Sequence, residues 1–76
     1  AEAFHLRETD APLLQKLPVQ WSRVLYMRHR DGMSYSRIVS EIGIPMGSLK
    51  SRMHRARAKL LALRVIHQTH DAVEKP

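Results

Sequence analysis

The chain of 76 residues carries 13 Lys and Arg against seven Asp and Glu, a formal net charge of +6, and it has no cysteine. This composition excludes a disulfide framework and a thiolate zinc site, and so short a chain leaves no room for a deep catalytic cavity. No apolar run approaches the roughly 18 residues that cross a bilayer and no charged-then-apolar leader is visible, so we expect a cytoplasmic protein without a membrane partner.

The chain begins with a mixed, aperiodic stretch, residues 1–8, which we interpret as a loose linker or a cut end. A first short helix is predicted to start at Thr9 or Asp10, whose side chains suit a helix N-cap, and to end before Pro18. A second helix is predicted over residues 19–30. Apolar residues at helical spacing should turn one face of it toward the core: Leu17, Trp21, Val24 and Leu25.

A third helix is predicted after a short break. Asp31 and Gly32 end the second helix, because glycine adopts the left-handed conformation that closes a helix. Ser34 is suited to cap the next helix, which reaches about Ile42. Gly-Ile-Pro at residues 43–45 then interrupts the periodicity.

The longest helical pattern covers residues 46–66. Its apolar positions step by four, three, four and three residues and form one stripe: Leu49, Met53, Ala56, Leu60 and Leu63. The pattern fades from His67 onward, so residues 67–76 are predicted to be a flexible tail. The chain is thus predicted to be all-α, a small four-helix domain over residues 9–66.

The third and fourth helices and their turn have the form of a helix-turn-helix motif, at about residues 35–54. The fourth helix is basic: between Ile42 and His70 there are six Lys and Arg and no acidic residue, so this segment accounts for the whole positive surplus. With the apolar stripe inward, mostly small residues face outward: Gly47, Ser51, His54 and Ala58. Such a face suits close approach to the floor of a DNA major groove.

Position in the motif suggests a role for each polar residue. The first turns of a recognition helix usually face the bases, and the candidates for base readout there are Ser48, Lys50, Ser51, His54 and Arg55. Arg55 can grip guanine with two hydrogen bonds. Arg52 and Arg57, nearer the apolar stripe, are predicted to contact phosphates, as is Arg37 on the third helix. Lys59 and Arg64 would reach a duplex only if it bent toward them.

Several short motifs resemble region four of the extracytoplasmic-function sigma factors. They are Leu-Pro at residues 17–18, GMSY at 32–35, Ile-Val at 38–39 and, most specifically, GIPMGSLKSRMHRAR at 43–57. The resemblance covers roughly residues 13–63. It implies double-stranded DNA of the promoter minus-35 element, the RNA polymerase beta flap and an anti-sigma factor as partners.

The sequence also departs from that family. Val-Gln-Trp-Ser stands at residues 19–22, where the family commonly has a charged run, and nothing resembles the region that reads the minus-10 element. We therefore expect an excised domain, or a protein in which region four acts alone.

Two other functions are compatible with the sequence. One alternative is a protein-interaction module for an anti-sigma factor or the polymerase flap, and another is the DNA-binding output domain of a response regulator. His67 and His70 have a spacing that can bind a metal, but they lie where the helical pattern fades. No oriented nucleophile, paired carboxylates or phosphate-cradling loop is present, so we expect no enzyme activity, metal or cofactor.

Overall fold

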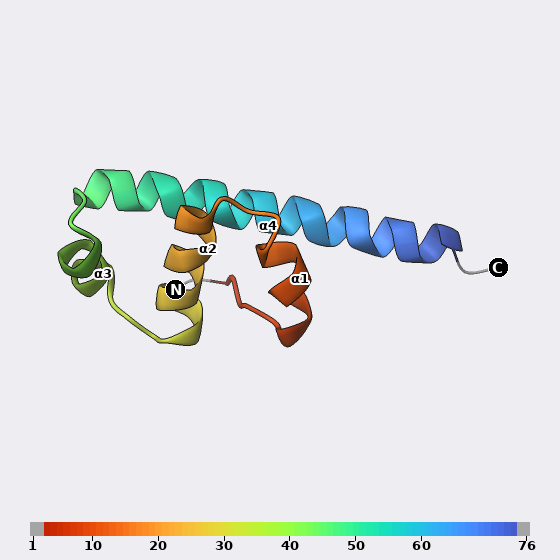
Figure 1. Cartoon of the computed structure of the whole chain (residues 1–76), viewed down its shortest axis with the longest axis horizontal. Coiled ribbons are helices and arrows are strands. Elements are labelled where there is room, and N and C mark those ends of the chain that lie inside the picture. The colour runs from red at the N-terminus through yellow and green to blue at the C-terminus, as the bar shows by residue number, and fades with distance from the viewer. Residues whose placement is uncertain (1–2, 75–76) are drawn as a thin grey trace.

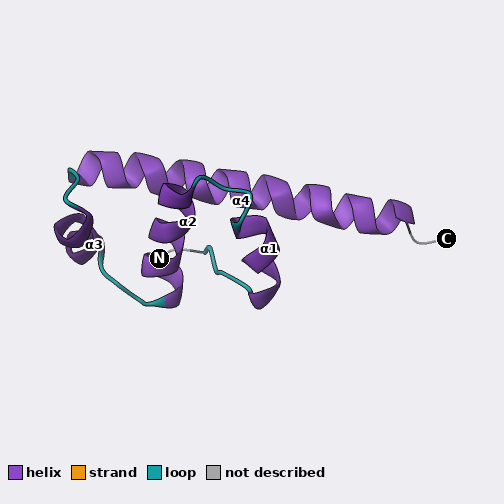
Figure 2. Ribbon diagram, in the orientation of Figure 1, coloured by secondary structure: helices purple, strands orange, loops and turns teal. Residues whose placement is uncertain are grey.

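Four α-helices and two brief helical segments of other pitch make up the structure (Figure 1, Figure 2). This computed structural model describes the backbone of residues 3–74 and the side chains of residues 3–67. The described residues contain no strand. The prediction of an all-α, four-helix domain is therefore confirmed.

The N-terminal segment was expected to be loose, but it packs against the rest of the chain. Residues 3–7 are not helical, yet Phe4 and Leu6 lie against the hydrophobic core. Burial of these two apolar side chains gives the segment a fixed position, which its aperiodic sequence did not reveal.

A 3₁₀ turn, η1 (Glu8–Asp10), leads into the short helix α1 (Ala11–Leu14). Asp10 directly precedes α1 but its side chain makes no capping hydrogen bond to that helix. The carboxylate instead accepts the backbone N–H of Arg7 at 2.8 Å. Asp10 is therefore not the side-chain N-cap of α1, and its carboxylate instead closes the start of η1 as part of a capping box with Arg7.

The second predicted helix is present over its full span but changes pitch. It consists of α2 (Val19–Leu25) and a π-helical turn, η2 (Tyr26–Arg30). The backbone N–H of Asp31 donates to the carbonyl of Tyr26 at 3.0 Å, five residues back, and Gly32 then ends the segment with a φ of +69°. The stop at Gly32 is as predicted.

The third helix, α3 (Tyr35–Ile42), has the two end signals expected from the sequence. The Ser34 hydroxyl accepts the backbone N–H of Arg37 at 3.1 Å, which satisfies one of the free donors at the helix start. At the other end Gly43 adopts a φ of +79°, and its N–H donates to Val39 at 2.8 Å. This left-handed residue turns the chain sharply into the next helix.

The last helix, α4 (Met46–Glu74), is the longest and runs along the long axis of the molecule. The other helices pack along its first half (Figure 1). Its predicted stripe lies in the core, where Leu49, Ala56 and Leu60 are fully buried. The buried apolar residues come from every α-helix, from η2 and from the turn between α1 and α2: Leu13, Leu14, Leu17, Val24, Leu25, Met27, Ile38, Leu49, Met53, Ala56 and Leu60. Trp21 lies at the edge of this core and is only half-buried.

The C-terminal end of α4 differs from the prediction. The helix was expected to stop near residue 66 and continues to Glu74, past α1 (Figure 1). The molecule is therefore elongated, with principal extents of 50 × 20 × 19 Å.

Candidate nucleic-acid interface

The first turns of α4 present one continuous exposed face. All five residues predicted to read bases lie on it and are exposed: Ser48, Lys50, Ser51, His54 and Arg55. The intervening Leu49 and Met53 are buried, with 0% and 1% exposure. The residues of α4 that pack in the core are therefore distinct from those on its exposed face. The turn at Gly43 leads from α3 into α4, and α3 lies below the first turns of α4 in the view of Figure 1.

The side chains on this face have no partners in the described part of the chain. Within residues 3–67, the side chains of the five predicted base readers form no hydrogen bond or ion pair, and neither do those of Arg52 and Lys59. Lys59 is exposed and Arg52 half-buried. Cations and hydroxyls without internal partners are available to an external ligand, and phosphate and base edges are the acceptors that suit them.

Arg57 is placed differently, although it lies only two residues after Arg55. It is half-buried, and its guanidinium donates to the Tyr35 hydroxyl at 2.8 Å and to His29 Nε2 at 3.3 Å. These bonds tie α4 to α3 and η2. The structure thus gives Arg57 a role in the fold, and its contact with a phosphate remains a prediction.

Arg64 belongs to the interior of the molecule. Its guanidinium donates to both carboxylate oxygens of Asp10, at 2.9 and 2.6 Å, and to the carbonyl of His5 at 2.7 Å. The Asp10 side chain is 1% exposed and that of Arg64 12%. The hydrogen bond from Arg64 holds the pKa of Asp10 below its ordinary value, against the opposing effect of burial. Arg64 is therefore not a candidate for DNA contact.

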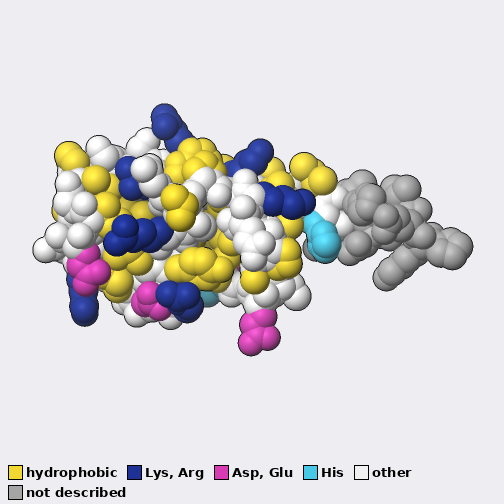
Figure 3. All heavy atoms as spheres, in the orientation of Figure 1, with side chains coloured by type: hydrophobic (Ala, Val, Ile, Leu, Met, Phe, Trp, Pro, Cys, Tyr) yellow, Lys and Arg dark blue, Asp and Glu magenta, His cyan; other side chains and the backbone are white. Residues whose placement is uncertain are grey.

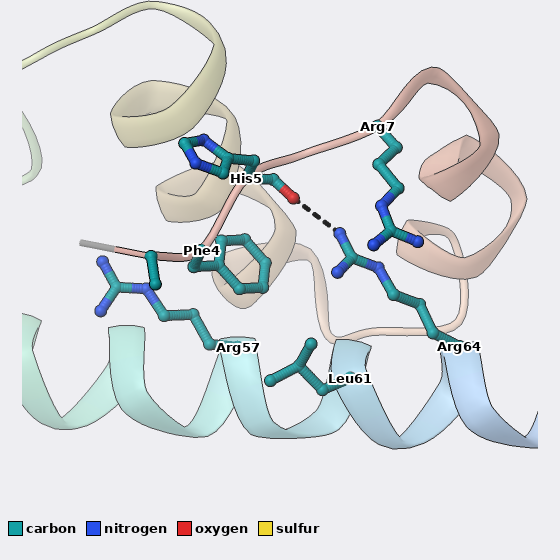
Figure 4. A pocket seen from close by; sticks show the side chains of 7 residues that line it. Phe4, His5, Arg7, Arg57, Leu61 and Arg64 are labelled. Atoms are coloured by element: carbon teal, nitrogen blue, oxygen red, sulfur yellow. Dashed lines mark hydrogen bonds between the residues drawn. The ribbon is translucent and has the colours of Figure 1, made fainter.

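The N-terminal segment completes this part of the structure. Figure 4 shows the Phe4 ring between Arg57 and Arg64, above Leu61, with the guanidinium carbons 5.8 and 5.2 Å from the ring centre. The ring also lies 4.7 Å from that of His29. These contacts hold the two arginines against the body of the domain.

Arg37 lies on the exposed side of α3, one turn after Ser34. Its guanidinium forms an exposed pair with Glu41 at 3.4 Å, one helical turn away. Such a pair is weak in water, so Arg37 can leave it for a phosphate.

A comparison with protein families decides what kind of domain this is. The model of the family Sigma-70, region 4 matches residues 13–60, which include the turn and the exposed face of α4. This chain belongs to the sigma-70 region 4 family. No curated protein and no solved structure gives a significant match to it.

Charge is distributed unevenly over the surface of this region 4 domain. On the face shown in Figure 3, the acidic side chains lie along the lower edge, away from α4, which runs along the upper edge. Every acidic residue between 3 and 67 precedes α4 in the chain: Glu8, Asp10, Asp31 and Glu41. The exposed face of α4 is therefore free of its own carboxylates.

A groove runs beside the exposed face, and sequence reasoning missed it. Gln20 and Trp21, at the start of α2, form one wall. The other wall comes from the first turns of α4: Gly47, Ser48, Ser51, Arg52 and Arg55. Helical periodicity correctly placed Trp21 on the core side of α2, but it carries no information on which α4 residues stand opposite.

The described residues of the region 4 domain show neither a membrane-spanning helix nor a cluster of metal ligands. No described helix combines the length and the apolar character needed to cross a bilayer. Within the described residues, no three His, Cys, Asp or Glu side chains gather as metal ligands would. The side chain of His70, one of the two histidines considered as metal ligands, lies outside the described residues.

Proposed function

We propose that this region 4 domain binds the minus-35 element of promoters sequence-specifically, as part of a sigma factor that directs RNA polymerase in transcription initiation. One observation carries the proposal: the family's helix-turn-helix presents a face of α4 whose donors have no partners within residues 3–67. The match to region 4 favours this function over the output domain of a response regulator.

The placement of the side chains supports a division of labour in the DNA complex. Ser48, Lys50, Ser51, His54 and Arg55 occupy the first three turns of α4 and read base edges in the major groove, with Arg55 bonded to a guanine. Arg52 and Lys59, at the sides of the same helix, neutralise phosphates. Arg37 adds a phosphate contact from α3.

Protein partners are proposed from a second surface. The part of α4 beyond the core exposes Leu61, Val65 and Ile66, by 46%, 62% and 63%. Exposed apolar side chains grouped on one helix favour contact with another protein. We assign to this part of α4 a contact with the polymerase beta flap or an anti-sigma factor, in a cytoplasmic sigma factor of the extracytoplasmic-function group.

Selection of bound DNA from a pool of random duplexes tests the DNA-binding proposal. The wild-type domain is expected to enrich one short motif, which should then be bound about a thousandfold more tightly than unselected duplex. Enrichment without a motif would reduce the function to non-specific binding. Absence of any binding at low salt would overturn the proposal and leave the protein-interaction module as the function to test.

A further inference from the structure

The groove between the start of α2 and the first turns of α4 has the chemistry of a phosphate-binding site. Its lining is mostly polar and includes no acidic residue. Hydrogen-bond donors stand on both walls: Gln20 and Trp21 on α2, and Ser48, Ser51, Arg52 and Arg55 on α4. Two guanidinium groups make the groove electropositive.

Trp21 is the residue in this groove whose placement calls for an explanation. The side chain is half-buried and packs against the core, but its indole N–H makes no hydrogen bond within residues 3–67. Among the described residues, every buried side-chain nitrogen or oxygen has a hydrogen-bond partner. Because the Trp21 N–H has none, it is not buried and is accessible to solvent. The indole therefore combines a fixed ring with an accessible donor.

The proposed docking of α4 places the groove beside one DNA strand. A helix in the major groove, which is about 12 Å wide, lies between the two sugar-phosphate backbones. An element packed along the side of that helix then faces one of these backbones. Trp21 and Gln20 are in that position, because their groove is shared with Ser51 and Arg55 of the base-reading face.

We propose that the groove holds a backbone phosphate of the DNA strand that passes between α2 and α4. The indole N–H of Trp21 donates to a phosphate oxygen, Gln20 donates a second hydrogen bond, and Arg52 supplies charge from the opposite wall. This inference rests on the proposed DNA binding. It adds α2 to the interface and assigns Trp21 to orienting the domain on the duplex, independent of the base sequence.

Trp21 is the single tryptophan of the chain, so its fluorescence reports on the groove directly. Titration with the selected duplex should change the emission of Trp21 and reduce its quenching by acrylamide. The same change is expected with an unselected duplex at low salt, because the contact is to the backbone. Unaltered emission and quenching at saturating DNA would overturn the proposal.

Two substitutions test the hydrogen bonds. Trp21→Phe keeps an aromatic ring against the core and removes the N–H, and should weaken binding about tenfold on selected and unselected duplexes alike, measured by anisotropy of labelled DNA. Gln20→Ala changes an exposed residue and should weaken binding severalfold with no loss of folding. Gln15→Ala, an exposed glutamine outside the groove, is the matched control and should bind as the wild type does.

Neutral methylphosphonates, placed one at a time along the selected duplex, separate this contact from a structural effect. At one phosphate the wild type should lose affinity and Trp21→Phe should lose little more, because its contact is already gone. If Trp21→Phe and wild type lose equally at every position, the phosphate contact is refuted. If the wild type binds DNA but neither substitution weakens it, this inference fails alone; if the wild type binds no DNA, the proposed function fails with it.

Discussion

Arg55 and Arg57 lie two residues apart on α4 and have opposite surroundings. Arg55 is exposed and has no partner within residues 3–67, whereas Arg57 is half-buried and bonded to Tyr35 and His29. A count of basic residues treats the two as equal. Their environments predict that one serves recognition and the other stability.

Substitution of each arginine by alanine should therefore change a different property. Arg55→Ala should cost about 1–3 kcal/mol of binding to the selected duplex and relax base preference, with the melting temperature unchanged. Arg57→Ala should lower the free energy of unfolding by about 1–2 kcal/mol, because Tyr35 loses its donor. Thermal melts and anisotropy titrations measure both. A stability loss in Arg55→Ala, or none in Arg57→Ala, would contradict these assignments.

The buried pair of Asp10 and Arg64 makes stability depend on acid pH. The hydrogen bond from Arg64 lowers the pKa of Asp10 in the folded state, so the unfolded state binds a proton more readily. The stabilisation is therefore full above the ordinary pKa of 3.8 and is lost as the pH falls through the lower folded value. Urea unfolding between pH 7 and pH 2 should show this loss.

Substitution at Asp10 separates this pair from general acid unfolding. Asp10→Asn leaves Arg64 buried beside a neutral group and should lower the free energy of unfolding at pH 7 by about 3 kcal/mol. It should also flatten the acid limb of the pH profile. Asp31→Asn removes an exposed carboxylate paired with Arg30 and serves as the control, with little expected change. If Asp10→Asn loses as much stability at acid pH as the wild type does, other carboxylates cause that loss.

At the scale of the elements, two glycines near the turn should respond to alanine in opposite ways. Gly43 has a φ of +79°, which is unfavourable for any residue with a Cβ, whereas Gly47 lies inside α4. A Cβ at either position would meet nothing within 4 Å, so backbone conformation alone decides the outcome. Gly43→Ala should destabilise the domain by about 1–2 kcal/mol. Gly47→Ala should stabilise it by up to about 1 kcal/mol.

Chemical denaturation of the two variants checks this pair. The substitution Gly47→Ala adds a methyl group on the base-reading face. This variant is therefore also expected to bind the selected duplex more weakly, although its melting temperature is higher. A shift of both melting points in the same direction would show that something other than backbone conformation dominates at the turn.

Element positions that depend on local signals were predictable from the sequence. The Ser34 cap, the turn at Gly43 and the 4-3-4-3 stripe of α4 each act within a few residues, and the structure contains all of them. The π-helical turn η2 was not predicted, because no local signal in Tyr26–Arg30 marks a change of helical pitch. The N-terminal segment was missed for a related reason, since Phe4 and Leu6 show no period.

Some residues of the candidate site could likewise be predicted from the local sequence, and others could not. Exposure of Ser48, Ser51 and Arg55 follows from the helical period alone. The partners of Arg57 and Arg64 lie 22 to 59 residues away in the chain, and no local pattern indicates such contacts. For the same reason, only tertiary structure could place Trp21 beside the base-reading face.

At the scale of the whole molecule, the separation of charge predicts how binding depends on salt. The cations on the side proposed to face DNA are Arg37, Lys50, Arg52, Arg55 and Lys59, and α4 has no carboxylate before residue 71 to oppose them. Each of them displaces counterions whether it contacts a base or a phosphate. With about five charges engaged, the logarithm of affinity should fall with the logarithm of salt at a slope of roughly −4 to −5.

Anisotropy titrations between 50 and 200 mM KCl give this slope. Lys59→Ala should reduce its magnitude by about one if Lys59 contacts a phosphate. Lys16→Ala, at an exposed position on the turn after α1, removes a cation outside the interface and should leave the slope unchanged. A response to salt that is flat for the wild type would argue against phosphate contacts altogether.

The alternation of buried and exposed positions along α4 has a consequence for DNA preference. The residues that would contact bases add no burial to the core, and those that hold the helix in place would touch no base. Exchanging Lys50, Ser51, His54 and Arg55 for another set should thus retarget the domain to a new operator without repacking its interior. Changes confined to the exposed face should therefore alter DNA preference while leaving the melting temperature close to that of the wild type.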